Sequence, residues 1–180
     1  MSLKFPISLV GKRASSGGDG PFATSLYDSG DNLLVSLEGD IPDYWKDNFS
    51  FTAPTYSQIQ IGSSCTSIGV AAFRFQYDIN QAETLIPDSV ITIKDRAFES
   101  AQNLGNLIIG KNVTSIGELS FGYINADRIE IHAVTAPTIH PQSFSSTFGI
   151  TDNSIHVPVG ATGYAATYGT NPVLTVVYDL

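Results

Sequence analysis

The sequence predicts a mostly β fold, a short solenoid of about four to five stacked coils with parallel strands. One phrase recurs along the chain, in the stretches "SSCTSIGVAAF", "DSVITIKDRAF" and "KNVTSIGELSF". Short apolar segments precede the copies of this phrase at matching positions. Hydrophobic residues make up 42% of the chain and charged residues only 14%, so a packed core is feasible.

The recurring phrase has apolar residues at fixed offsets. Its isoleucines are spaced by 25, 23 and 23 residues, at Ile68, Ile93, Ile116 and Ile139. A phenylalanine follows each of them five residues later, at Phe73, Phe98, Phe121 and Phe144. A smaller apolar residue precedes each isoleucine by three positions, at Cys65, Val90, Val113 and Ala136. Equivalent residues of stacked coils lie above one another, so we expect columns of buried side chains.

Short strands should open each coil. Apolar segments that read as strands end at Ile61, Ile86, Ile109, Ile131 and Val157. One coil therefore reads as a strand, a turn, a short second strand ending at the phrase isoleucine, and a tight segment carrying the phenylalanine. Each buried Ile or Phe contributes about 1.5–3 kcal/mol. Gly69 and Gly117 follow two of the phrase isoleucines, where we expect a positive φ.

The two ends of the chain depart from the repeat. Ile41 stands where a phrase isoleucine would fall, with Trp45 or Phe49 near the phenylalanine position, so we expect an atypical capping repeat there. We therefore divide the chain into an extended N-terminal arm (1–32), an atypical capping repeat (33–58), repeats (59–154) and a small C-terminal cap (155–180).

The charge pattern disfavours two classes of partner. The net charge is −8, and the nine Lys and Arg residues are scattered without a basic stripe. We therefore expect no nucleic acid and no membrane among the partners. No apolar run approaches the ~20 residues that span a bilayer. The start of the chain lacks the residue order of a secretory signal, so we expect no signal peptide.

The chemically capable residues show no catalytic or metal-binding pattern. Cys65 belongs to an apolar column, which predicts a buried, inert thiol. His132, His140 and His156 lack the spacing of metal ligands. We therefore expect no catalytic residue, no cofactor and no metal. An enzymatic alternative, a glycan hydrolase of a virus particle, would need a cleft with two close carboxylates.

Two segments of the repeat region resemble a known family. The stretches "IPDSVITIKDRAFESAQNL" and "IGKNVTSIGELSFGY" resemble the leucine-rich repeats of bacterial surface-antigen type, called BspA-like. The resemblance covers about residues 59–157 and implies a right-handed leucine-rich-repeat solenoid. The cysteine that usually follows Ala-Phe in this family is absent here. Members occur on bacterial surfaces, in protist proteins and in phage virions, so the resemblance implies adhesion and protein binding without catalysis.

The tail "IHVPVGATGYAATYG" also resembles the usual ending of this family. The resemblance implies a strand and then a short helix that starts near Tyr164. The tryptophan that usually follows that helix is missing. A final strand over residues 173–178 is expected beyond it.

The N-terminal arm is the first candidate for contact with a partner. Its apolar residues Phe5, Ile7, Leu9 and Val10 could extend the sheet of another protein by adding a strand. We expect a non-enzymatic structural and interaction protein that binds protein partners through this arm and the solenoid face. A bacteriophage virion component fits best: a decoration, tail-fibre or baseplate-associated subunit, in a homo-oligomer or a larger assembly.

A secreted or cell-surface bacterial adhesin is the alternative, and it would place the protein outside the cell or on its surface. Such an adhesin would bind a host protein with its sheet face, through exposed side chains between the columns. The candidates are Arg74, Gln76, Tyr77, Arg96 and Tyr123.

Overall fold

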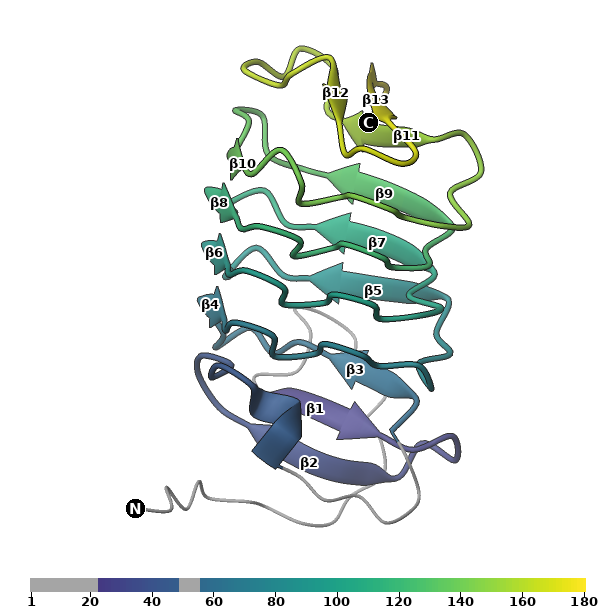
Figure 1. The fold of residues 1–180 in the computed structure, drawn as a ribbon. Coiled ribbons are helices and arrows are strands. Elements are labelled where there is room, and N and C mark those ends of the chain that lie inside the picture. Colours follow the sequence, from purple (N-terminus) through teal and green to yellow (C-terminus); the bar gives the residue numbers. More distant parts are fainter. Residues whose placement is uncertain (1–22, 49–55) are drawn as a thin grey trace.

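Stacked coils of short strands build the molecule (Figure 1). The structure, a computed structural model, describes residues 23–48 and 56–180. One side of the stack is a sheet in which four strands run parallel and in register. These strands are β5 (Glu83–Ile86), β7 (Asn106–Ile109), β9 (Arg128–Ile131) and β11 (Ser154–Val157). All four end at the residue that the sequence predicts, so the expected mostly β solenoid with parallel strands, of about five turns, is confirmed.

A second side of the stack carries the middle of each phrase. Its two-residue strands form a four-stranded parallel sheet in the order β10-β8-β6-β4. They are β4 (Ser67–Ile68), β6 (Thr92–Ile93), β8 (Ser115–Ile116) and β10 (Thr138–Ile139). Each ends at a phrase isoleucine, and these isoleucines are register partners from coil to coil. The predicted isoleucine column is therefore confirmed, with Ile68, Ile93 and Ile116 buried and Ile139, at its end, partly buried.

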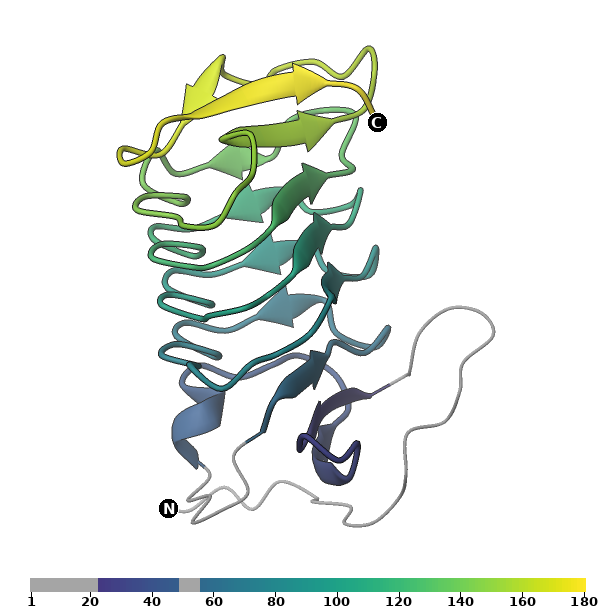
Figure 2. The same cartoon turned by 90° about the vertical axis from the view of Figure 1, so that its right-hand side faces the viewer.

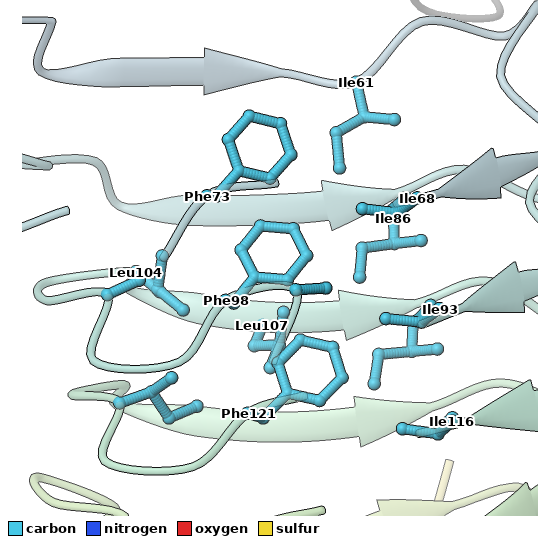
Figure 3. Close-up of a cluster of buried hydrophobic side chains, with 14 of the residues drawn as sticks. Ile61, Ile68, Phe73, Ile86, Ile93, Phe98, Leu104, Leu107, Ile116 and Phe121 are labelled. Atoms are coloured by element: carbon cyan, nitrogen blue, oxygen red, sulfur yellow. The ribbon is translucent and has the colours of Figure 1, made fainter. Parts of the chain in front are cut away.

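The phenylalanine column runs through the core (Figure 3). Centroid distances between successive rings are 4.9, 5.4 and 5.3 Å, and the rings of Phe73, Phe98, Phe121 and Phe144 are stacked. All four side chains are fully buried. Trp45 continues the column beyond Phe73 toward the N-terminal end, with the two ring centroids 5.6 Å apart in an edge-on contact. Ile41 pairs with Ile68 in a parallel bridge, so both columns extend into the atypical first copy.

The third side of each coil is a series of turns. Every second amide there donates to the next coil, as Phe73 N does to Ala97 O and Phe98 N does to Ser120 O. Seven residues after the phrase isoleucine, the backbone adopts a positive φ without glycine, at Phe75, Ser100, Tyr123 and Ser146. The cost of a left-handed residue is about 1–2 kcal/mol. Amides that point along the stack compensate for it, because each coil then hydrogen-bonds to its neighbour.

The two glycines after the phrase isoleucines have a different role from the expected one. Neither Gly69 nor Gly117 has a positive φ, so that expectation is wrong. A Cβ on Gly69 would lie 2.4 Å from the carbonyl carbon of Pro42, on the coil below. A Cβ on Gly117 would lie 2.6 Å from the Asp95 amide nitrogen. Glycine is needed here because two backbones approach closely.

The N-terminal end is closed by an antiparallel sheet. β1 (Thr24–Tyr27) lies between β2 (Leu33–Leu37) and β3 (Gln58–Gln60) and is antiparallel to both. β1 falls within the expected arm, yet its four residues are buried. A single 3-10 turn, η1 (Trp45–Asn48), follows β2. Phe49 lies outside the described residues.

The C-terminal end is closed by a strand pair. β13 (Leu174–Tyr178) runs parallel to β11, and β12 (Thr167–Tyr168) pairs with β13 in the antiparallel sense (Figure 2). The final strand is therefore confirmed, but the short helix near Tyr164 is wrong. Gly163 and Gly169 have φ values of 83° and 78°, and the five residues between them are too few for a stable helix. Tyr164 instead donates its hydroxyl to Ala133 O at 2.7 Å.

Candidate functional site

The turn side of the solenoid gathers the predicted contact residues. Arg74, Arg96 and Tyr123 lie on the turns of three successive coils, and Gln76 and Tyr77 directly follow the first of these turns. None of the five lies on a strand, so they are not on the sheet face. The arm residues Phe5, Ile7, Leu9 and Val10 lie outside the described residues. We call this surface the turn ridge, and its residues are Arg74, Phe75, Gln76, Tyr77, Arg96, Glu99, Gln102 and Tyr123.

Two aromatic rings and one guanidinium form the lower part of the turn ridge. The rings of Phe75 and Tyr77 have centroids 6.3 Å apart and an interplanar angle of 24°. The Arg74 guanidinium carbon lies 4.1 Å from the Phe75 ring centroid, which is within cation–π range. Phe75 is 41% exposed and Tyr77 is 61% exposed. The ridge therefore presents aromatic surface to solvent with a cation packed on it.

A buried carboxylate anchors both arginines of the turn ridge. Glu99 keeps only 7% of its side chain exposed, and its Oε2 lies 2.6 Å from Arg74 Nε. Arg96 Nη1 lies 3.4 Å from Glu99 Oε1. Truncating Glu99 would leave two cations without their common partner. Both arginines therefore pair with one carboxylate while 31% and 40% of their side-chain surfaces face solvent.

Hydrogen bonds between coils hold the ridge backbone. Phe75 N donates to Glu99 O at 2.8 Å, and Gln102 N donates to Gln76 O at the same distance. The Gln102 side-chain amide donates to Tyr123 O at 3.0 Å, which links the second coil to the third. A surface held in this way loses little conformational entropy when a partner binds. Arg, Tyr and Phe are also enriched in protein–protein interfaces.

Cys65 and His156, two residues with reactive side chains away from the turn ridge, are buried in the structure. Cys65 is fully buried, as predicted, and burial raises the pKa of its thiol to about 11. His156 is buried, with Nδ1 2.8 Å from Asp179 Oδ1 and Nε2 3.0 Å from Asp152 Oδ2. Within residues 23–48 and 56–180, no group of three or more His, Cys, Asp or Glu side chains is arranged to hold a metal ion. No helix in that part of the chain is long and apolar enough to cross a membrane.

Sequence reasoning missed Phe75, Glu99 and Gln102 as members of this surface. Phe75 reads as an apolar core residue, yet it lies two positions after the core phenylalanine Phe73. The same register position carries Ser100, Tyr123 and Ser146 in the following coils. That mixture of residues could have indicated an outward position. No such signal existed for Glu99, whose two arginine contacts depend on the stacking of coils.

Comparison with known proteins identifies the repeat. The BspA type leucine rich repeat region matches residues 71–178, in six copies. This range is more than half of the chain, so the chain belongs to that family. Repeats of this family are typical of surface or extracellular proteins that mediate protein–protein interaction, and they are typically non-enzymatic. No curated protein and no solved structure matches the chain.

Proposed function

We propose that this chain is a non-enzymatic interaction protein that binds a protein partner through the turn ridge. The observation that carries the proposal is the combination of exposed aromatic rings with arginines paired to a buried carboxylate. The family supports it, because its repeats typically mediate protein–protein contact. Burial of an aromatic or arginine anchor is the usual source of affinity in such contacts.

The finer proposal is a structural subunit of a phage particle, such as a decoration, tail-fibre or baseplate-associated protein. It rests on the occurrence of similar repeats in phage virions. The alternative is an adhesin on a bacterial surface, which is favoured by the surface and extracellular setting typical of the family. In the phage particle the turn ridge would contact a neighbouring structural subunit, and in the adhesin it would contact a host protein.

Site-specific photo-cross-linking separates these assignments. The chain would be produced in the organism that encodes it, with benzoylphenylalanine in place of Tyr123. Cross-linked peptides would then be identified by mass spectrometry. We expect cross-links to structural proteins in purified particles. If the chain is missing from particles and instead cross-links to host proteins on intact cells, the adhesin assignment replaces the virion assignment.

A matched position on the sheet tests the role of the turn ridge itself. Leu85 is 48% exposed on β5, so a benzoylphenylalanine there samples the sheet face at similar exposure. Cross-links from Leu85 but not from Tyr123 would refute the turn ridge as the contact surface.

The variants Phe75→Ser and Tyr123→Ser place a serine at a register position where two other coils already carry one, Ser100 and Ser146. They should therefore fold normally and reduce partner binding at least tenfold, which corresponds to ~1.4 kcal/mol.

A further inference from the structure

The C-terminal end of the solenoid is almost free of charge. Residues 131–178 contain one carboxylate, Asp152, and no Lys or Arg. Asp179 follows directly, 45% exposed and paired with His156 and Arg128. Fifteen of the seventeen carboxylates and all nine Lys and Arg residues lie before residue 131. The charge-poor segment is therefore about a quarter of a chain that has a net charge of −8.

Apolar and small side chains are exposed on this end. Val159 is 72% exposed, Val173 is 52% exposed and Tyr178 is 46% exposed. Ala165, Ala166 and Thr167 are exposed between them along the chain. We call these six residues the cap surface. They lie on β12, on β13, in the loop before β12 and in the loop between the two strands, and these elements form the end of the stack (Figure 2). Depletion of charge together with exposed apolar side chains is the compositional mark of an interface core.

The edge strands at the two ends of the solenoid differ in the charge of the residues that flank them. Both ends are closed by antiparallel strands, β2 at one end and β12 at the other. Exposed acidic residues border β2 on both sides, with Asp31 before it and Glu38 after it. Charges of this kind protect an edge strand from pairing with another chain. β12 has no charged residue within ten positions on either side. The absence of this protection is expected where a partner covers the edge.

We propose that the cap surface is an interface between two copies of this chain. Two acidic copies repel each other wherever like charges meet. None of the six residues of the cap surface is charged, so two copies can approach there with less repulsion than at the other, acidic end. A two-fold axis brings the same surface of each copy together and places β12 beside its own symmetry mate. The dimer then has its two turn ridges available, so this proposal does not depend on the proposed function.

Sedimentation equilibrium of the purified chain tests the dimer. We expect a dimer for the unmodified chain and monomers for Thr167→Glu and Val173→Glu, because each change places like charges face to face across the axis. Ile91→Glu is the matched control, since Ile91 is 42% exposed and lies away from the cap, next to β6. That variant should remain dimeric. A monomeric unmodified chain overturns the proposal, as does a dimer that only the control disrupts.

A disulfide test remains informative if the glutamate variants fail to fold. Thr167→Cys would introduce an exposed thiol, because the native Cys65 is fully buried. Under mild oxidation we expect a covalent dimer, whereas Ser63→Cys, at an exposed position near β4, should stay monomeric on a denaturing gel. Equal cross-linking of both variants would contradict the proposed interface. Phe75→Ser should leave the dimer intact, which separates this test from that of the turn ridge.

Discussion

Two register positions on the same turns behave in opposite ways. Five residues after each phrase isoleucine stands a phenylalanine in all four copies, fully buried in one column. Seven residues after the isoleucine the copies carry Phe75, Ser100, Tyr123 and Ser146. Each ring of the inner column packs against the ring above and below, so one residue type suits every coil. At the outer position the residue type changes from coil to coil, so this position can vary without interrupting the stack.

The largest difference between the two positions should appear in the free energy of unfolding. Phe98→Ala removes a ring that stacks on Phe73 and Phe121, and we expect a loss of about 3–5 kcal/mol. Tyr123→Ala removes a side chain that is 44% exposed, and we expect a change within about 0.5 kcal/mol. Urea unfolding followed by circular dichroism measures both. Similar losses for the two variants would contradict the division between inner and outer positions.

Two glycines extend the comparison of packed and unpacked positions to the backbone. Gly105 and Gly160 both have a positive φ, of 61° and 81°. A Cβ on Gly105 would lie 2.2 Å from Ala82 O on the coil below, whereas a Cβ on Gly160 would meet nothing within 4 Å. Gly160→Ala should therefore cost only the backbone term, about 1 kcal/mol. Gly105→Ala should cost about 2 kcal/mol or more, since the coils must also separate. Thermal denaturation compares them, and equal costs would show that close stacking has no part in the glycine requirement.

The smallest effect concerns carboxylates that link one coil to the next. The Val70 amide, followed by Lys94, lowers the pKa of Asp43 below its ordinary value of 3.8. The Lys111 side chain and amide lower the pKa of Asp88 in the same way. Because these pKa values are lowered on folding, the stability they contribute is present above about pH 4 and is lost as the pH falls through the folded values. Each carboxylate is about half exposed, so its contribution should stay below ~1 kcal/mol.

Melting temperatures measured from pH 7 down to pH 3 check this. Asp43→Asn keeps an acceptor for the Val70 amide but removes the titrating group. The variant should lose less stability than the unmodified chain on acidification. Parallel curves for the two proteins would contradict the assignment.

Much of the fold follows from the sequence, because the periodic pattern depends on local spacing. Four strand ends, the isoleucine column and the phenylalanine column could all be predicted from offsets alone. The helix expected near Tyr164 could not, because Gly163 and Gly169 break the segment and β12 finds a partner in β13. The turn ridge was predicted in part. Tyr77 and Tyr123 were found as exposed residues, but Phe75 resembles a core residue in sequence.

The sequence by itself determined the solenoid, because a repeated phrase with apolar residues at fixed offsets can bury them only by stacking. Tertiary structure alone decided which residues share a surface. Glu99 contacts Arg74 because two coils lie next to each other in the stack, and the pair is 25 residues apart in the chain. Gly69 is required because Pro42 passes beneath it. Such contacts depend on how neighbouring coils settle against each other, which no spacing within a single coil records.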